Sequence, residues 1–184
     1  MSLKHAILTL LETEDGTGYD LLKRFEDHLG YFWNASHQQI YAQLKTMHKG
    51  ALIDCQLEAQ DDKPDKKIYT LTDSGRQALS EWVQQPLKLG KVKDALLVKI
   101  YAGHLANKEQ LLEEMLHYRD SHKRMLQTFL AIEDEYRNSS KKKQQELAMP
   151  FLTLRRGIIG EKACIEWAEE VINYLQKQTA GANK

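Results

Sequence analysis

Apolar residues recur every three or four positions along most of this 184-residue chain, which is the spacing of amphipathic helices. In the amino-terminal half this spacing predicts one helix over residues 3–11 and another over residues 19–29. Residues 15–18, Asp-Gly-Thr-Gly, interrupt the pattern between them, because glycine favours turns over helix interiors. The chain therefore begins with two short helices joined by a tight connection.

A third helix is predicted after Ser36, whose hydroxyl suits a helix N-cap, and it ends at Gly50. Its apolar residues, at positions 40, 44 and 47, fall on one side. The opposite side is polar but contains no acidic residue. The central residues of that side are Gln38, Ala42, Lys45 and Lys49, with Gln39, Tyr41 and Thr46 beside them.

Two runs with strand character come next, over residues 51–59 and 67–72. The charged segment between them contains Pro64 and ends in Lys66–Lys67, as expected of a hairpin connection. Thr72 is then the predicted N-cap of a helix that ends near residue 83. The inward side of that helix is predicted to hold Leu79, Trp82 and Val83. Three helices, a two-stranded hairpin and a following helix, in that order, predict a winged helix-turn-helix.

The polar side of the third helix has residue types that suit base recognition. A helix-turn-helix places its second helix in the major groove of DNA. There, glutamine pairs with adenine and lysine donates to guanine, so specificity is expected from Gln38, Gln39, Ala42 and Lys45. Tyr19, Tyr41, Lys45, Lys66 and Lys67 are expected mainly at phosphates. The full set of predicted DNA-binding residues is Tyr19, Ser36, His37, Gln38, Gln39, Tyr41, Ala42, Lys45, Lys49, Lys66 and Lys67.

The charge balance of the amino-terminal half leaves a second interpretation open. Residues 1–86 hold 9 Lys and Arg against 13 Asp and Glu, a net charge of −4, whereas residues 87–184 carry +4. DNA binding by the first half therefore depends on where its positive charges lie. The alternative is a winged-helix protein-interaction module, in which the third helix binds a partner protein and does not bind DNA directly. The salt dependence of DNA binding distinguishes the two.

Several short motifs of this half resemble those of the PadR family of winged-helix transcriptional regulators. They are Gly-Tyr at residues 18–19, Ile-Tyr at residues 40–41 and Tyr-x-Leu-Thr-x-x-Gly at residues 69–75. The resemblance covers nearly all of residues 3–84 and implies a DNA-binding regulator. The wing departs from the pattern, because residues 64–67 are Pro-Asp-Lys-Lys where family members often have Gly-Arg. This favours a loose phosphate contact by the two lysines over entry of the wing tip into a minor groove.

The carboxy-terminal half follows a connection at residues 85–90 and contains two long helical patterns. Asn107 and Gln110 resemble a capping box at the start of the first. Both patterns alternate intervals of four and three, as in a heptad seam. The first predicted seam is Leu111, Met115, Tyr118, His122, Met125, Phe129, Ile132 and Tyr136. The second is Leu147, Phe151, Leu154, Ile158, Glu161, Ile165, Ala168, Ile172 and Leu175.

The two seams must be buried, and the sequence allows two arrangements. The turn-like segment Asn138–Lys143 permits an antiparallel hairpin within one chain, and the same helices can also pair across a dimer. Pro150 is expected in the first turn of the second helix, which therefore begins or kinks near Met149. Residues 179–184 are predicted to be a flexible tail.

Residues 150–175 are similar to the carboxy-terminal region of the virulence-activator, AphA-like, subgroup of the PadR family. The shared features are Leu-x-x-Gly-Ile at residues 154–158 and the late Trp167. This resemblance implies a homodimer held by the long helices, and two-fold related copies would read half-sites about 34–36 Å apart. The predicted dimerisation residues are Leu111, Met115, Tyr118, His122, Met125, Phe129, Leu154, Ile158, Ile165, Trp167 and Ile172.

Enzymatic and metal-dependent functions are not indicated. The sequence contains no phosphate loop, glycine fingerprint, nucleophile elbow or metalloprotease motif. His117, Asp120 and His122 are metal ligands by type, but the two histidines are five residues apart on a helix and point in different directions. His122 is interpreted as a seam residue that sets register or senses pH. No enzyme activity, cofactor or metal is predicted.

Other residues keep two interpretations each. Trp33, Trp82 and Trp167 allow a pocket for a small aromatic effector between the two halves, as some PadR-like regulators have, although core packing is favoured by residue type. Arg155 and Arg156 either add positive charge or pair with acids across an interface. The acids available for this are Glu161, Glu169 and Glu170. Lys141–Lys143 are expected in a solvated turn, and Cys55 and Cys164 as reduced structural thiols.

The sequence as a whole predicts a mostly α-helical protein with a small β-hairpin wing. A winged helix-turn-helix DNA-binding domain is expected at residues 1–85 and a helical, coiled-coil-like dimerisation domain at residues 91–178. No stretch approaches the roughly 18 apolar residues of a membrane span, and a cytoplasmic protein is expected. The predicted function is a homodimeric, sequence-specific regulator of transcription acting on a pseudo-palindromic operator. Its predicted partners are double-stranded DNA, a second copy of the chain and a small aromatic effector.

Overall fold

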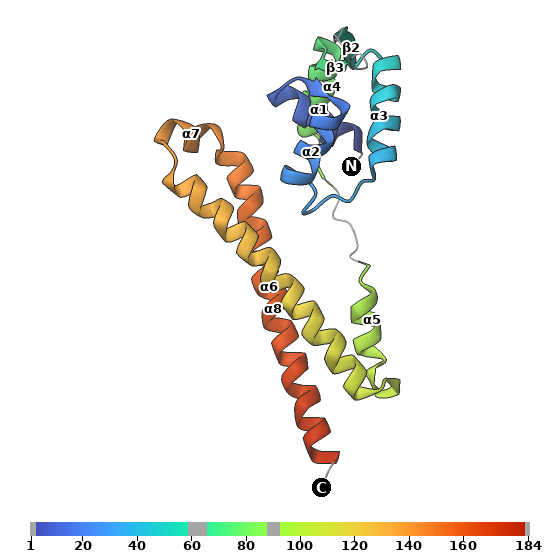
Figure 1. Cartoon of the computed structure of the whole chain (residues 1–184), viewed down its shortest axis with the longest axis vertical. Coiled ribbons are helices and arrows are strands. Elements are labelled where there is room, and N and C mark those ends of the chain that lie inside the picture. Colours follow the sequence, from blue (N-terminus) through green and yellow to red (C-terminus); the bar gives the residue numbers. More distant parts are fainter. Residues whose placement is uncertain (1–2, 59–65, 88–92, 183–184) are drawn as a thin grey trace. The chain divides into compact units, whose positions relative to one another are not determined.

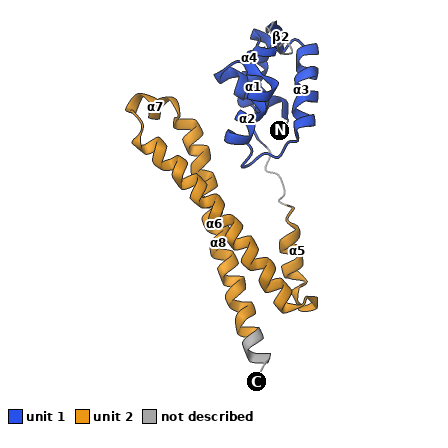
Figure 2. Ribbon diagram, in the orientation of Figure 1, with its two compact units in different colours: residues 1–90 blue, residues 91–184 orange. Residues whose placement is uncertain are grey.

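The computed structural model describes residues 3–58, 66–87 and 93–182. The chain forms two compact units, residues 1–90 and residues 91–184 (Figure 2). Unit 1 contains α1 (Leu3–Thr13), β1 (Gly16–Thr17), α2 (Gly18–His28), α3 (His37–Lys49), β2 (Ile53–Glu58), β3 (Lys66–Leu71) and α4 (Asp73–Val83) (Figure 1). Unit 2 contains α5 (Ala95–Tyr101), the short 3-10 helix η1 (Gly103–Leu105), α6 (Lys108–Asn138), α7 (Lys141–Glu146) and α8 (Ala148–Ala182). This order confirms the predicted fold class.

The core of unit 1 forms around α1, which packs against α2, α3, α4 and β3. Apolar residues spaced three and four apart on the helices meet there and are buried. On α3 these are the predicted inward residues Ile40, Leu44 and Met47. Since the core holds this side of α3, the polar side of the helix faces solvent.

The sheet of unit 1 has three antiparallel strands in the order β1, β3, β2. β2 and β3 pair from Ile53 with Leu71 to Glu58 with Lys66, which is the predicted wing. β1 pairs with the other side of β3, and the sequence pattern does not predict it because a two-residue strand has no periodicity. The predicted wing tip around Pro64 lies outside the described residues.

α4 begins at the predicted N-cap. Thr72 accepts a hydrogen bond from the Gly75 N–H at 3.0 Å and donates one to the Ala51 carbonyl oxygen at 2.8 Å. A Cβ at Gly75 would overlap the Leu52 carbonyl oxygen. Glycine at this position therefore lets α4 approach the chain that leads into β2, which explains the last residue of the Tyr-x-Leu-Thr-x-x-Gly motif.

The prediction that Val83 lies on the inward side of α4 is wrong. Leu79 and Trp82 are half-buried, and Trp82 stacks on His5 of α1 with ring centroids 4.4 Å apart. Val83, by contrast, is 68% exposed. At roughly 100° per residue, Val83 lies only about 40° around the helix from Leu79, so the spacing alone favours its burial. Val83 is the last residue of α4, and its exposure depends on what lies beside that end of the helix.

Unit 2 is built on α6 and α8, which pack against each other as an antiparallel hairpin (Figure 1). The two predicted seams therefore meet within one chain, which decides between the two arrangements that the sequence allows. Leu111 and Met115, near the start of α6, share a buried cluster with Ile172, near the end of α8. Towards the α7 end of the hairpin, the rings of Tyr136 and Phe151 stack at 4.0 Å.

The connection between the long helices is itself partly helical. α7 follows Ser140, whose hydroxyl accepts a hydrogen bond from the Lys143 N–H at 3.3 Å. α8 begins at Ala148, so Pro150 lies in its first turn, where the missing backbone donor is not needed. The predicted start of this helix near Met149 is confirmed.

Two expectations for unit 2 need correction. Leu147 lies between α7 and α8 and is exposed, so it does not belong to the seam that begins with Phe151. α8 continues to Ala182, so the first four residues of the predicted tail, 179–184, are helical. The heptad pattern places Leu147 in the seam only if α8 extends back to it, and the chain bends at that residue instead.

Candidate nucleic-acid interface

The two helices of the helix-turn-helix each begin with a capping box. At α2, Thr17 Oγ1 accepts from the Asp20 N–H at 3.1 Å, and Asp20 Oδ2 accepts from the Thr17 N–H at 3.0 Å. At α3, Ser36 Oγ accepts from the Gln39 N–H at 3.3 Å, and Gln39 Oε1 accepts from the Ser36 N–H at 2.9 Å. These reciprocal bonds fix the residue at which each helix begins, and so the side that each later residue faces.

Asp20 and Arg24 stabilise the turn that leads from α1 into α2. Hydrogen bonds from the side chain and backbone of Thr17 stabilise the carboxylate of Asp20 and hold its pKa below the ordinary value, and the charge of Arg24 acts in the same direction. Arg24 Nη1 donates to the Glu14 carbonyl oxygen at 2.6 Å, and Nη2 donates to that of Asp15 at 3.1 Å. The turn between α1 and α2 is therefore tied to the helix that follows it.

The outward side of α3 presents Gln38, Ala42, Lys45 and Lys49, all of them exposed. Among the described residues, no hydrogen bond or ion pair is recorded for the side chains of Gln38, Lys45 or Lys49. The side thus combines one free amide with two free ammonium groups. Such groups can donate to base edges and to phosphate oxygens.

Three other residues predicted to bind DNA are engaged at the start of α3. Ser36 and Gln39 form the capping box, and His37 Nε2 lies 3.3 Å from Glu26 Oε1 of α2. A bidentate pair with adenine needs both the oxygen and the nitrogen of a glutamine amide. Gln39 can make that pair only by giving up its bond to the Ser36 backbone, whereas Gln38 is free to make it.

Tyr41 lies on the side of α3 that meets α2. Its ring packs over Gly18, the first residue of α2, so closely that a Cβ there would overlap Tyr41 Cε1. Tyr19 is the next residue of α2 and is exposed. Both predicted phosphate-contacting tyrosines therefore lie at the amino-terminal end of a helix, the end that attracts anions.

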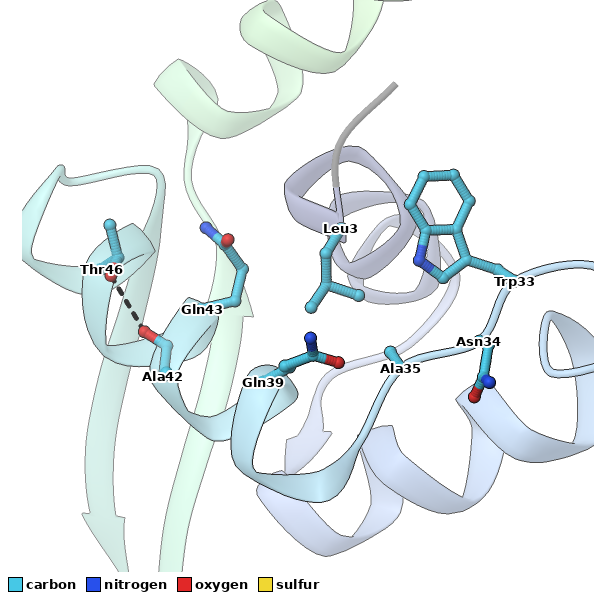
Figure 3. Close-up of a pocket in the computed structure, with 8 residues that line it drawn as sticks. All are labelled: Leu3, Trp33, Asn34, Ala35, Gln39, Ala42, Gln43 and Thr46. Atoms are coloured by element: carbon cyan, nitrogen blue, oxygen red, sulfur yellow. Dashed lines mark hydrogen bonds between the residues drawn. The ribbon is translucent and has the colours of Figure 1, made fainter. Parts of the chain in front are cut away.

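On its other side, α3 borders an open groove of about 470 Å³ (Figure 3). Gln39 projects from α3 toward Leu3, and Trp33 lies on the other side of Leu3, on the turn between α2 and α3. Gln43 and Asn34 are not among the DNA-binding residues predicted from the sequence, although Gln43 lies four residues after Gln39 and so on the same side of the helix. The groove is lined by Leu3, Trp33, Asn34, Ala35, Gln39, Ala42, Gln43 and Thr46.

The two wing lysines lie at the start of β3 and are exposed. Lys66 pairs in register with Glu58, and Lys67 with Leu57. Since successive residues of a strand point to opposite faces of a sheet, the two lysines leave the wing on opposite faces. The departure from the family pattern at Pro64 begins outside the described residues.

Comparisons with known proteins agree with this geometry. Residues 7–81 match the model of the transcriptional regulator PadR-like family, and residues 92–176 match that of the virulence activator alpha C-term. The negative transcriptional regulator PadR of Bacillus subtilis is 32% identical over 186 residues, which cover 95% of this chain and 98% of that protein. This chain belongs to the PadR family.

Solved structures of PadR-family proteins share the fold of this chain. The crystal structure of Bacillus subtilis PadR with operator DNA has a TM-score of 0.80 at 30% identity, covering 94% of this chain and 98% of that one. The structure of the same protein with p-coumaric acid has a TM-score of 0.74 at 28% identity, covering 95% and 98%. The Vibrio cholerae virulence activator AphA has a TM-score of 0.76 at 34% identity, covering 96% and 99%. The predicted membership of the AphA-like subgroup is confirmed.

This PadR-family chain is thus a transcriptional regulator with a winged-helix DNA-binding fold. Within the described ranges, no helix combines the length and apolar character needed to cross a bilayer. Over the same ranges, no group of three or more His, Cys, Asp or Glu side chains is arranged to hold a metal ion. The candidate ligand His122 instead lies with Nδ1 2.5 Å from Glu161 Oε2, and Asp120 pairs with Arg119.

The residues predicted for dimerisation pack within this PadR-family chain. Leu111, Met115, Phe129, Ile158 and Ile172 are buried in unit 2 by its own helices. The other predicted residues are half-buried in the same unit, and they are Tyr118, His122, Met125, Leu154, Ile165 and Trp167. The five buried side chains are covered by helices of their own chain, whereas the half-buried ones keep part of their surface exposed. The periodicity finds a seam but does not say which helix fills it.

Most of the charged residues whose roles the sequence leaves open are paired within unit 2. Arg155 Nη1 lies 3.2 Å from Glu133 Oε1, and Arg137 Nη2 lies 2.6 Å from the same oxygen. Arg137 and then Arg155 hold the pKa of Glu133 below its ordinary value. Lys123 Nζ lies 3.0 Å from Glu169 Oε1. Arg155 and Glu169 therefore have ion-pair partners within their own chain.

The three tryptophans do not form one pocket within either unit. Trp33 and Trp82 line a cavity of about 110 Å³ in unit 1, together with His5, Ala6, Thr9, Leu29 and Phe32. Trp167 belongs to unit 2, where its ring meets Tyr118 edge-on at a centroid distance of 5.8 Å. The unit 1 cavity is therefore the one in which two of these rings can contact a small molecule.

Proposed function

We propose that this protein binds a pseudo-palindromic operator as a homodimer and regulates transcription without catalysing a reaction. Residues 1–85 act as the DNA-binding domain and residues 91–178 as the dimerisation domain. The observation that carries the proposal is the outward side of α3, which is exposed, free of acids and borne by the second helix of a helix-turn-helix. PadR of Bacillus subtilis bound to operator DNA supports the same mode. Since operators are genomic DNA, we infer that the protein acts in the cytoplasm.

The proposal divides the DNA-binding residues by role. Gln38, Ala42 and Lys45 read base edges in the major groove, because they occupy the outermost side of α3. Among the described residues, no partner is recorded for the side chains of Gln38 and Lys45. Tyr19, Tyr41, Lys49, Lys66 and Lys67 contact phosphates and set the register. Ser36, His37 and Gln39 hold the amino-terminal end of α3 in place.

The groove beside α3 extends this interface. Asn34 and Gln43 bring two more amides to its lining, next to the residues that read bases. Amides can donate to phosphate oxygens, which is a common way of fixing the register of a protein on the duplex. We assign these two residues to backbone contacts on the side of α3 away from Tyr41.

Control by a small aromatic effector is part of the proposal. Bacillus subtilis PadR has been solved with p-coumaric acid, which is such a molecule. In this chain the cavity of about 110 Å³ lined by Trp33, Trp82, His5 and Phe32 offers aromatic surfaces. It is somewhat smaller than the roughly 150 Å³ of an engineered cavity that binds benzene. A single aromatic ring is therefore the largest group that we expect it to hold without a side chain moving.

The experiment that tests the proposed function starts from sheared genomic DNA. Fragments bound by the purified full-length protein are sequenced, and the most enriched fragment is titrated between about 50 and 200 mM salt beside a scrambled fragment. The expected result is a pseudo-palindrome whose half-sites lie one helical turn or a multiple apart, bound with a steep salt dependence. Lys162→Glu, a change on α8 far along the chain from the reading helix, is the control.

Equal and weak binding to every fragment, with little salt dependence and with or without p-coumaric acid, overturns the proposal. It would favour the rival function, a winged helix whose α3 binds a protein partner. The net charge of −4 over residues 1–86 favours this alternative, because negative charge is repelled by DNA. A weak dependence of DNA affinity on salt concentration distinguishes this alternative from DNA binding. Neutralising DNA phosphates releases counterions, and contacts with a protein partner at this surface do not.

A further inference from the structure

α8 carries apolar side chains on two opposite sides, whereas an amphipathic helix carries them on one. One side is the seam that packs on α6, with Ile158, Ala168 and Ile172 buried. On the opposite side, four large apolar side chains are exposed to solvent by 75%, 60%, 56% and 63%. They are, in that order, Met149, Leu152, Ile159 and Tyr174. At roughly 100° per residue, these four lie within about 40° of one line along the helix, directly across from the seam.

The same line also carries small residues and charges. Gly160 and Ala163 lie near its middle. Arg156 lies seven residues before Ala163 and Glu170 seven residues after it, and both are exposed. A Cβ at Gly160 would lie 2.8 Å from Arg156 Nη1, so the guanidinium of Arg156 extends along the helix toward Ala163.

Arg156 and Glu170 differ from their neighbours in having no ion pair within the described part of the chain. Arg155 pairs with Glu133, and Glu169 pairs with Lys123. Glu161 is likewise held by a histidine of α6. Across the described residues, no ion pair is recorded for Arg156 or Glu170. Of the five charged residues predicted as candidates for an interface, Arg156 and Glu170 are the two left without an ion pair among the described residues. The exposed Glu166 lies one turn before Glu170.

We propose that this outer side of α8, which we call the α8 outer stripe (residues 149, 152, 156, 159, 160, 163, 166, 170 and 174), binds the outer stripe of α8 in a second copy of the chain. The two helices run antiparallel about a two-fold axis that passes beside Ala163. The inference rests on the proposed homodimer and names the surface that makes it. It assigns the dimer contact to the outer side of α8 in place of the seam residues, which pack against other helices of the same chain.

Self-complementarity is the reason for choosing a second copy over another partner. An antiparallel pair with its axis at Ala163 brings each residue opposite the one equally far on the other side of that position. Leu152 then meets Tyr174 of the second copy, and Arg156 meets Glu170 of the second copy. An apolar residue faces an apolar one, and a base faces an acid, twice in each dimer. A different partner would not require this symmetry.

The spacing along the stripe supports close packing of two helices. When Gly160 is left aside, the stripe positions from Met149 to Glu170 alternate intervals of three and four, which is the pattern of helices that cross at a shallow angle. Ala163 at the centre has a small side chain that allows the two backbones to approach, since the distance between helix axes depends on the side chains at the contact. The charged residues flank this centre, as charges do at the rim of an interface.

The first test exchanges the charges and measures the dimer dissociation constant of the full chain by sedimentation velocity. Arg156→Glu places a negative charge opposite the acidic residues of the second copy. The double variant Glu166→Arg, Glu170→Arg places positive charges opposite Arg156 of the second copy. Each is expected to raise the dissociation constant about tenfold or more, because two contacts per dimer become repulsive. The variant with all three changes inverts every charge of the set and is expected to return to within about threefold of the original. Lys162→Glu, a quarter turn away on the same helix, is the matched control.

The second test locates the axis by chemical cross-linking. In a Cys55→Ala, Cys164→Ala background, Ala163→Cys is expected to join two copies through a disulfide on mild oxidation, because a residue beside a two-fold axis meets its own copy. Lys162→Cys in the same background is the control and is expected to stay unlinked at the same protein concentration.

The outcomes separate this inference from the proposed function. The α8 pairing is overturned if the charge exchanges have no effect and Ala163→Cys does not cross-link, while the protein remains dimeric. That result leaves the proposed homodimer and its operator binding intact. Val98→Glu then tests the exposed apolar side of α5, formed by Leu97, Val98 and Tyr101, as the actual interface. A wild-type chain that stays monomeric at all concentrations, with and without operator, overturns both. Restoration by the triple variant supports the pairing directly, since a loss of folding is not restored by further charge changes.

Discussion

Tyr41 of α3 lies over Gly18 of α2 so closely that the two helices have no room for a side chain at residue 18. A Cβ there would overlap Tyr41 Cε1 and lie 3.1 Å from Cζ and 3.2 Å from the hydroxyl oxygen. This contact joins the first helix of the helix-turn-helix to its reading helix. It gives a physical reason for the glycine of the Gly-Tyr motif and for the tyrosine of the Ile-Tyr motif, which meet in space although they are 23 residues apart in sequence.

Replacing Gly18 tests this contact. Gly18→Ala is expected to lower the free energy of unfolding by about 1–3 kcal/mol, because the added methyl group must displace Tyr41 or the helix. Urea denaturation measures the change. The loss should shrink when Tyr41→Ala is added, because the obstructing ring is gone. Gly103→Ala is the control, since a Cβ there would meet its nearest neighbour, Leu111, at an ordinary 3.7 Å. Equal losses at Gly18 in both backgrounds would contradict the assignment.

The Asp20 capping box predicts a pH dependence of stability. The folded-state pKa of Asp20 lies below its ordinary value because Thr17 donates to the carboxylate. The folded state therefore gains stability from this group at pH values above the ordinary pKa, and this gain disappears as the pH falls through the folded-state pKa. Asp20→Asn should be less stable than the original chain at neutral pH, and the difference should narrow below about pH 4. Thermal unfolding at a series of pH values measures it.

A matched substitution controls for charge alone. Asp27 lies in the same helix and is exposed, but it takes no part in the capping box. Asp27→Asn should change stability less than Asp20→Asn at neutral pH, and its effect should not fade with acidification in the same way. If the two substitutions behave alike, the capping box is not the origin of the effect.

The seam pair His122 and Glu161 predicts a difference between single and double substitutions. Their side chains are 25% and 18% exposed, and Nδ1 of His122 lies 2.5 Å from Oε2 of Glu161. His122→Leu leaves a half-buried carboxylate without its partner and should cost about 1–3 kcal/mol of unfolding free energy. Replacing both residues with leucine should cost less than either single change, because nothing polar is then left unpaired. A double-mutant cycle by denaturant unfolding measures the coupling. Additive losses would show that the two residues act independently.

The DNA-binding surface predicts different effects for base-reading and phosphate-binding residues. Gln38→Ala should lower affinity for the selected operator by about 1–3 kcal/mol while leaving binding to scrambled DNA nearly unchanged. Lys67→Ala should weaken both by similar factors and reduce the salt slope by about 1. Fluorescence anisotropy with both DNA fragments at several salt concentrations measures the two effects. If Gln38→Ala weakens both fragments equally, that residue does not read bases.

Much of the local structure follows from the sequence alone. Ser36 and Thr72 cap the helices that were expected to begin there, and positions 40, 44 and 47 form the buried side of α3. Pro150 lies in the first turn of α8. These features depend on contacts between residues a few positions apart, so the residue types and their spacing are sufficient to predict them.

What depends on distant parts of the chain was decided by the tertiary structure. The sequence predicts two apolar seams in the long helices, but only the packed hairpin shows that they fill each other, because spacing describes one helix and not its neighbour. The exposure of Val83 and the short strand β1 are of the same kind. In each case a residue's role depends on what lies opposite it. The packed hairpin buries the seams and leaves the outer stripe of α8 exposed, which is why we propose that stripe as the surface for a second copy.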